Sequence, residues 1–172
     1  PAVSDPESAP MTRSQARPSY NGSPWTNSHA CYWLNPYSND VQGYLTSLAL
    51  ELAGLGFDEV LFDNFYFPNS DRISWTGSVT KQEAILDAAD NLSANLLNQS
   101  IRLDLGTNDP EVAAYGARAF MPTNNASQME DDIAALSDVL PDTASQIVYL
   151  TDSRDTRFAA CGALRPLLDE TE

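Results

Sequence analysis

The chain has 172 residues, of which 42% are hydrophobic and 19% are charged, and this composition predicts one globular domain rather than a disordered chain. Its formal net charge of -15, with only 9 Lys and Arg residues, argues against a nucleic-acid partner, because phosphate binding needs clustered cations. No apolar run approaches the roughly 18 residues that a membrane span needs, so no span is expected.

The first part of the chain has no pattern of regular structure. Residues 1–27 mix several prolines with Ser, Gly and Asn, without helical or strand periodicity, which is typical of an irregular arm or linker. We expect the domain itself to span residues 28–172. Because the sequence opens with Pro1 rather than Met, we also expect it to be a trimmed piece of a longer protein.

The two cysteines, Cys31 and Cys161, lie far apart in the sequence. No C-x-x-C pair or His/Cys cluster accompanies them, so neither a zinc site nor another metal or cofactor is expected. Two buried free thiols are the default expectation, and a disulfide between them is the alternative. His29 is the only histidine and has no nucleophile motif near it, so a Ser-His-Asp triad or a Cys-His pair is not predicted.

Taken in chain order, the first predicted element is a strand. A short apolar run at residues 30–34 predicts a strand that ends at Asn35, because the proline that follows removes a backbone donor. Apolar residues at helical spacing then predict an amphipathic helix over residues 39–54. The next stretch, G-F-D-E-V-L-F-D-N-F-Y-F-P at Gly56–Pro68, predicts a strand buried on both faces that runs out into an aromatic loop.

The rest of the chain repeats these patterns. Capping-box spacing between Thr80 and Glu83 opens a second amphipathic helix, which ends near Asn98. The segments that follow predict, in turn, a strand, a short helical turn, a strand, a helix, a strand and a final helix at residues 101–105, 109–115, 117–121, 127–140, 146–150 and 155–164.

Five strands alternating with five helical segments predict an α/β fold with a parallel sheet. A closed eight-stranded barrel usually takes about 250 residues, so the chain forms either an open sheet or a piece of a barrel. Such a sheet leaves edges exposed. We therefore expect a missing N-terminal half, a partner chain or the arm at residues 1–27 to cover them.

Carboxylates fall where predicted strands end, and α/β folds gather their chemistry at the C-terminal strand edge. Asp63 follows the central apolar run and is the first candidate, and Asp104 near the end of the next predicted strand is the second. Asp152, after the last strand, is a reserve. Asp58 and Glu59 lie at the start of a strand, at the opposite end of the sheet, and are interpreted as structural or solvated.

Three motifs in the first half of the chain carry a resemblance. They are G-x-x-W at Gly22–Trp25, W-L-N-P-Y at Trp33–Tyr37, and G-F-D-E-V-x-F-D with its aromatic continuation at Gly56–Pro68. In order and spacing they resemble the "putative glycoside hydrolase" families of the domain-of-unknown-function type, which are similar to the TIM-barrel glycosidases. The chain departs from that pattern at Tyr66, where Arg is common, and at Asn64, where Tyr is common.

The resemblance implies part of a TIM barrel, about five of its eight strands, with Asp63 ending the fourth strand. It also implies a glycoside hydrolase of the two-carboxylate type, in which Asp63 is the nucleophile or base and Asp104 is its partner. The alternative is a non-catalytic carbohydrate-binding or protein-interaction module on the same scaffold. A bacterial source and an extracellular or cell-surface location are expected on the same ground.

Carbohydrate as the partner predicts a particular set of binding residues. Sugars present apolar ring faces fringed with hydroxyl groups, so their sites combine aromatic platforms with amide and carboxylate groups. The residues of this kind near the predicted strand ends are Trp33, Asn35, Tyr37, Tyr66 and Trp75.

Overall fold

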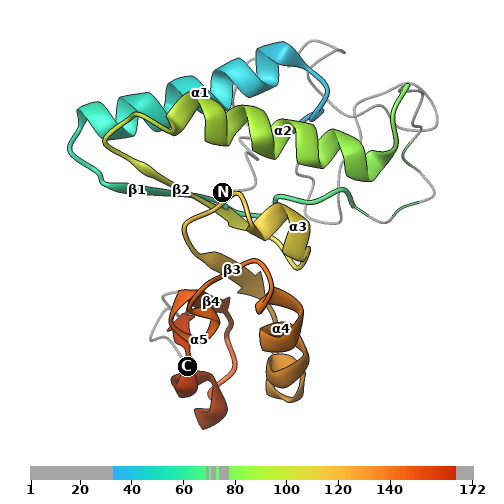
Figure 1. The fold of residues 1–172 in the computed structure, drawn as a ribbon, viewed down its shortest axis with the longest axis vertical. Helices are drawn as coiled ribbons and strands as arrows, with labels where there is room; N and C mark the ends of the chain where they lie inside the picture. Colours follow the sequence, from blue (N-terminus) through green and yellow to red (C-terminus); the bar gives the residue numbers. More distant parts are fainter. Residues whose placement is uncertain (1–32, 69, 71–72, 74–77, 166–172) are drawn as a thin grey trace, which may run out of the picture.

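The structure is a computed structural model that describes residues 33–68, 70, 73 and 78–165. The arm at residues 1–27, together with Cys31 and Trp75, lies outside these ranges. The described residues form a single parallel sheet with helices on one side (Figure 1). The predicted parallel α/β fold is therefore confirmed.

Five parallel strands follow one another in the order of the sequence, β1-β2-β3-β4-β5. Because every strand pairs with the next one along the chain, the sheet grows in one direction and has the topology of part of a (β/α) barrel. The strands are β1 Glu59–Phe62, β2 Arg102–Gly106, β3 Ala119–Pro122, β4 Ile147–Leu150 and β5 Gly162–Leu164.

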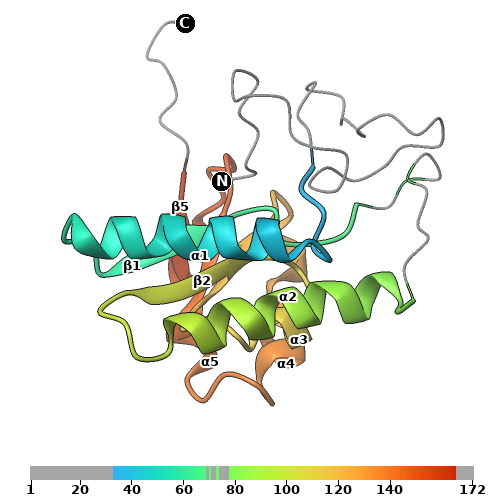
Figure 2. The same ribbon diagram turned by 90° about the horizontal axis from the view of Figure 1, so that it is seen from above.

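Helices α1 (Asn39–Gly54) and α2 (Lys81–Leu96) lie side by side over β1 and β2 (Figure 2). The capping box predicted for α2 is present: the Thr80 hydroxyl accepts a hydrogen bond from the backbone N–H of Glu83 at 3.1 Å, and the Glu83 carboxylate accepts one from the backbone N–H of Thr80 at 2.6 Å. Alternate residues of the two strands, including Val60, Phe62 and Leu105, pack into the apolar core beneath these helices.

The second half of the sheet has its own core. It is covered by the shorter segments α3 Pro110–Ala113, η1 Ala126–Gln128, α4 Met129–Leu136, α5 Thr143–Gln146 and η2 Thr156–Ala160. Fully buried Tyr149 and Phe158 pack with their ring centroids 5.1 Å apart at the centre of this core. Here α4 ends at Leu136, before the predicted stop at a proline, and a turn continues to the buried Leu140.

One predicted element is wrong, and another lies mostly outside the described residues. Most of the first predicted strand, residues 30–34, lies outside the described residues; in its described part, Trp33 has no regular structure and Leu34 forms an isolated bridge. The final helix over residues 155–164 is wrong: it is a 3-10 turn followed by the fifth strand of the sheet. A side chain at Gly162 would place its Cβ 3.1 Å from Val148 Cγ2, so Gly162 lets β5 approach β4 closely, and this pairing overrides local helix propensity.

The second face of the sheet faces away from α1 and α2 and corresponds to the interior of a barrel. Side chains alternate along a strand, so Glu59, Leu61, Arg102 and Asp104 share this face while their neighbours pack under the helices. In the ranges that the structure describes, no helix is long and apolar enough to cross a membrane.

Candidate active site

Asp63 lies directly after β1, at the C-terminal edge of the sheet where the prediction places it. The pairing of Phe62 with Leu105 puts Asp63 beside Gly106, the last residue of β2. The backbone N–H of Phe65 donates a 2.7 Å hydrogen bond to the carbonyl oxygen of Gly106, which fastens the loop after β1 to the end of β2. Asp63 is thus held on the interior face at the rim of the sheet.

Asn64 holds the Asp63 carboxylate on two sides. Its backbone N–H donates to Asp63 Oδ1 at 2.7 Å, and its side-chain Nδ2 donates to Asp63 Oδ2 at 3.2 Å. Asn64 has a φ of 55°, the only positive φ of a non-glycine residue in the described part of the chain. Asn tolerates this left-handed conformation better than most residues, so the sequence suits the turn that aims the carboxylate.

The absence of a side chain at Gly106 is what makes room for the Asp63 carboxylate. A Cβ atom built on Gly106 would lie 2.5 Å from Asp63 Oδ1 and 2.9 Å from the Asp63 Cα. Neither distance is compatible with van der Waals contact. Alanine at position 106 must therefore displace Asp63 or move β1 away from β2.

We expect Gly106→Ala to lower the free energy of unfolding by about 1–3 kcal/mol, because overpacking a fixed backbone contact costs that much. Thermal denaturation measures this. Gly43→Ala is the matched control: Gly43 lies inside α1, and nothing lies within 4 Å of the place that an alanine methyl group would take, so alanine there should raise stability by about 0.5–1 kcal/mol. Equal effects of the two substitutions would contradict the close packing of Gly106 against Asp63.

Asp104 lies in the middle of β2, because the strand extends to Gly106 rather than ending beside Asp104. It pairs in register with Leu61, so it shares the interior face with Asp63 but sits one side-chain layer deeper. Its side chain is fully buried, at 0% exposure. Asp104 Oδ1 accepts a 2.7 Å hydrogen bond from the backbone N–H of Arg118, while no N–H or O–H group donates to Oδ2.

Burial, together with the neighbouring Glu59 carboxyl group, raises the pKa of Asp104 to about 7. The pKa of Glu59 is lowered instead, first by its interaction with Asp104 and then by Arg118. Of the two neighbouring carboxyl groups, we therefore assign the proton to Asp104 and the negative charge to Glu59. A proton on Asp104 Oδ2 gives that buried oxygen a hydrogen bond to donate to Glu59.

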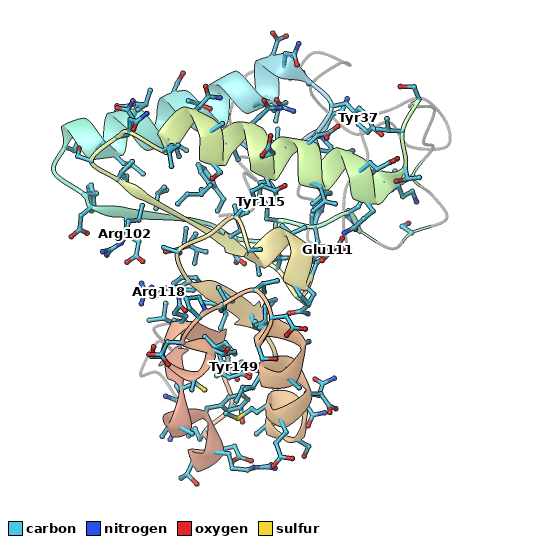
Figure 3. The ribbon with its side chains drawn as sticks, viewed as in Figure 1. Tyr37, Arg102, Glu111, Tyr115, Arg118 and Tyr149 are labelled. Atoms are coloured by element: carbon cyan, nitrogen blue, oxygen red, sulfur yellow. The ribbon has the colours of Figure 1, made fainter. Side chains whose placement is uncertain are left out.

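Two arginines hold Glu59 in its charged form at the N-terminal ends of the strands. Arg118 Nη2 lies 2.6 Å from Glu59 Oε2, Arg118 Nε donates to Glu59 Oε1 at 2.9 Å, and Arg102 Nη2 is 3.7 Å away from Oε2. Figure 3 shows Arg102 and Arg118 on the side of the sheet away from α1 and α2. These ion pairs place Glu59 in a structural cluster, as the sequence interpretation expected.

The predicted aromatic residues take different positions. Trp33 and Tyr66 meet edge to face, with ring centroids 5.2 Å apart, and Tyr66 keeps 37% of its surface exposed near Asp63. Asn35 Oδ1 accepts a hydrogen bond from the Tyr37 backbone N–H at 3.2 Å and so stabilises its own turn. The Tyr37 hydroxyl donates to the carbonyl oxygen of Val79 at 2.7 Å. Tyr37 therefore anchors the segment before α1 to the start of α2, and burial raises the pKa of its hydroxyl.

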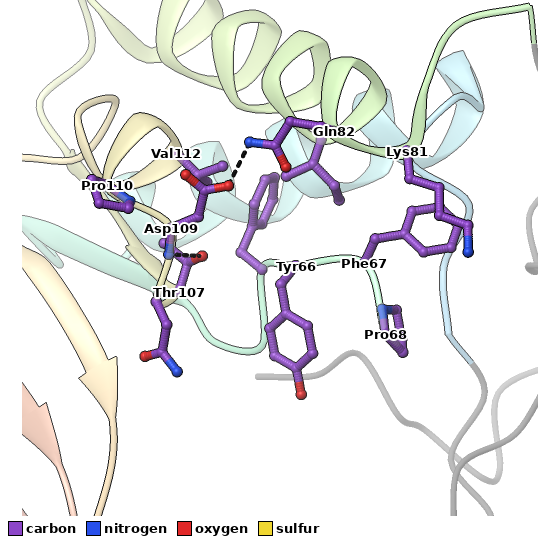
Figure 4. Close-up of a pocket in the computed structure, with 12 residues that line it drawn as sticks. Tyr66, Phe67, Pro68, Lys81, Gln82, Thr107, Asp109, Pro110 and Val112 are labelled. Atoms are coloured by element: carbon purple, nitrogen blue, oxygen red, sulfur yellow. Dashed lines mark hydrogen bonds between the residues drawn. The ribbon is translucent and has the colours of Figure 1, made fainter. Parts of the chain in front are cut away.

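A cavity of about 700 Å³ lies between the loop after β1, the first turn of α2 and the loop after β2 (Figure 4). Asp63 is not among the residues that line it, but Phe65, two residues further along the same loop, is. Its apolar wall includes Phe65, Tyr66 and Phe67. Its polar wall includes Gln82 and Asp109, whose side chains are hydrogen-bonded to each other. Ligand sites commonly combine such an apolar lining with a few polar groups and have a volume of about 300–1,000 Å³.

Three threonines that the sequence interpretation missed stabilise the rim. Thr107, Thr123 and Thr151 directly follow β2, β3 and β4, and each hydroxyl accepts a hydrogen bond of 3.1 to 3.2 Å from the backbone N–H two residues further on. Asn124 joins the last two loops, since its Oδ1 accepts from the Thr151 hydroxyl at 2.8 Å and from the Asp152 N–H at 3.1 Å. The signal that could have found them is a threonine directly after three successive strands, β2, β3 and β4.

Among the described residues, no three His, Cys, Asp or Glu side chains lie close enough together to hold a metal ion. Cys161 carries a free thiol, and burial raises its pKa.

Comparison with known proteins decides the family. The family described as "Putative glycosyl hydrolase domain" matches residues 2–149, most of the chain. The chain belongs to this family. The resemblance that the motifs suggested is thus confirmed. None of the curated proteins matches the sequence.

Two solved structures are similar to this glycosyl hydrolase domain. Ega3 of Aspergillus fumigatus, crystallised in complex with galactosamine, matches with a TM-score of 0.59 and 13% identity over 90% of this chain and 66% of its own. At that identity the likeness supports the fold, a TIM-barrel-like arrangement of which this chain forms a half-barrel. A hypothetical protein of Ruminiclostridium thermocellum is 32% identical over 58% of this chain, with a TM-score of 0.48, and the chain covers 50% of its length.

Proposed function

We propose that this domain hydrolyses glycosidic bonds at the C-terminal edge of its sheet, with Asp63 as the nucleophile or base and Asp104 as the acid. The observation that carries the proposal is the position of Asp63. Asp63 is a carboxylate at the end of a parallel strand. Two hydrogen bonds from Asn64 fix its orientation, and it packs closely against Gly106. Barrel enzymes place their catalytic groups at such strand ends.

Two observations support the acid role of Asp104: its raised pKa and its position on the strand next to that of Asp63. Its pKa of about 7 keeps the carboxyl group protonated in weakly acidic solution, which a group that protonates a leaving oxygen requires. Asp63 and Asp104 face the same side of adjacent strands, two residues apart in register. Neighbouring side chains in that relation are separated by roughly 7–8 Å, within the range of two-carboxylate glycosidases.

The adjacent cavity supports carbohydrate as the substrate. Its lining places aromatic side chains, Phe65, Tyr66 and Phe67, near the amide of Gln82 and the carboxylate of Asp109, which is the combination that sugar-binding sites use. Trp33 supports this platform through its edge contact with Tyr66. Asn35 and Tyr37 do not line the cavity; in this proposal they stabilise the segment before α1, through the hydrogen bond between them, and Tyr37 also joins that segment to the start of α2.

One observation favours a second candidate, a non-catalytic carbohydrate-binding module. Asp104 has no exposed surface, so the acid can reach a substrate only if the interior of the half-barrel opens above it. If the interior never opens, a sugar can still contact Tyr66 and Asp63, but no acid is available to protonate the leaving group. The two candidates therefore differ in turnover rather than in binding.

A panel of oligosaccharides and polysaccharides separates the two candidates. Hydrolysis is measured as the release of new reducing ends, and binding is measured on the same panel by calorimetry. Turnover of at least one glycan by the wild-type chain is expected. Binding without the release of reducing ends would support the binding module instead.

We also propose that further chain, from the same polypeptide or from a partner, completes the barrel. The chain spans only 50% and 66% of the two solved structures that it resembles. In the sheet of the described residues, β1 and β5 lie at the two edges, each paired on one side. An extracellular or cell-surface location remains part of the proposal, because large glycan polymers are found there.

A further inference from the structure

Asn64 connects the candidate carboxylate to the candidate sugar platform. On one side it donates two hydrogen bonds to Asp63, at 2.7 and 3.2 Å. On the other side, its backbone carbonyl accepts a 3.0 Å hydrogen bond from the Tyr66 backbone N–H, and its Oδ1 lies 3.4 Å from the Tyr66 hydroxyl. One residue therefore contacts both groups that a sugar would meet.

The chemistry of the two contacts fixes the orientation of the Asn64 amide. An ionised carboxylate only accepts hydrogen bonds, so the group that faces Asp63 must be the NH₂. The oxygen is then left to accept from the hydroxyl of Tyr66. Aspartate at position 64 could serve Tyr66 in the same way but would present a second negative charge to Asp63.

The backbone of Asn64 has a conformation that is unfavourable for most residues other than glycine. A φ of 55° lies in the left-handed region, which disfavours most side chains. Glycine would adopt it without strain, yet glycine would keep only the backbone N–H contact with Asp63 and would lose the amide. The side chain thus brings two contacts that the turn itself does not need.

We propose that Asn64 is a positioning residue that fixes the Asp63 carboxylate and couples its orientation to Tyr66. The proposal rests on the proposed function, in which Asp63 attacks or activates and Tyr66 carries a sugar ring. A ring that presses on Tyr66 would then tighten the contact between Asn64 and Asp63. Substrate binding and carboxylate alignment would reinforce each other.

The variants are chosen to separate the backbone from the amide. Asn64→Gly keeps the turn and the backbone N–H, and Tyr66→Phe removes only the hydroxyl. Asn98→Gly is the matched control, since Asn98 lies in an exposed turn after α2, at the opposite end of the sheet. Kinetic constants on a glycan that the wild type cleaves, the melting temperature and the crystal structure of Asn64→Gly are measured.

We expect Asn64→Gly to lower kcat by about 100-fold with little change in KM or melting temperature, because slight misalignment of a reacting group costs that much. Asn98→Gly should leave kcat unchanged. Adding Tyr66→Phe to Asn64→Gly should cost less than it does in the wild type, since both act through one contact. In the crystal structure of Asn64→Gly, the Asp63 carboxyl group should rotate away from Gly106.

An unchanged kcat in Asn64→Gly, or an Asp63 carboxyl group that stays in place in its crystal structure, would overturn the positioning role. A fall in melting temperature that accounts for the lost activity would do the same. If the wild type cleaves no glycan, the proposed function fails, and the crystal structure still decides whether Asn64 positions Asp63. The two failures can therefore be told apart.

Discussion

Asp63→Asn is expected to reduce kcat/KM on any glycan that the wild type cleaves by about 1,000-fold or more, because a neutral amide can act neither as a nucleophile nor as a base. Asparagine has the same shape, and its Oδ1 can still accept the hydrogen bond from the backbone N–H of Asn64. The fold should therefore persist, with a change in the free energy of unfolding within about 1 kcal/mol. Initial rates and thermal denaturation measure the two effects.

Asp58→Asn is the matched control for this substitution. Asp58 is exposed and precedes β1, so it lies at the opposite end of the same strand from Asp63. We expect full activity in Asp58→Asn. Retained activity in Asp63→Asn would contradict the assignment of Asp63, and loss of activity in Asp152→Asn but not in Asp104→Asn would move the acid role to the reserve carboxylate.

Asp104→Asn is expected to remove a pH dependence of stability and, at the same time, to lower activity. In the folded wild type Asp104 keeps its proton up to a pKa of about 7, whereas an unfolded aspartate loses it near 4. Between these values the folded state binds more protons than the unfolded state. Wild-type stability should therefore be highest at low pH in this window and fall as the pH rises, by about 2–4 kcal/mol in total.

Asparagine at position 104 mimics the protonated acid at every pH. Its Oδ1 can accept from the Arg118 N–H, and its amide can donate to Glu59. Chemical denaturation at pH 5 and pH 8 should show a smaller fall for Asp104→Asn than for the wild type, and activity should drop by about 100- to 10,000-fold if Asp104 is the acid. The same pH dependence in both proteins would contradict the protonated state of Asp104.

The sequence predicted most of the scaffold because local patterns and tertiary packing agree there. The helix over residues 39–54 and the capping box at Thr80 each have a local signal that the core reinforces, and both are present. The position of Asp63 was predictable for the same reason. A short buried run followed by a carboxylate and an aromatic loop is typical of a strand that ends at a functional edge.

The parts that the sequence did not reveal depend on contacts between distant residues. Gly162 belongs to β5 because it pairs with Val148 of β4, a residue distant in the sequence. The residues around Gly162 have no local pattern that distinguishes a short strand from the end of a helix. Asp104 proved to be a buried interior residue, because β2 continues for two further residues beyond it. Its raised pKa and its proximity to Glu59 follow from the pairing of β1 with β2. The periodicity of the sequence does not predict which strands pair or in which register.

The most direct test of the account is the crystal structure of Asp63→Asn with an oligosaccharide that the wild type cleaves. We predict a sugar ring against Tyr66, with the bond to be cleaved about 3 Å from the side chain of residue 63, at the edge formed by the loops after β1 and β2. An oligosaccharide bound away from this rim, such as near Arg102 and Arg118 at the opposite strand ends, would contradict it.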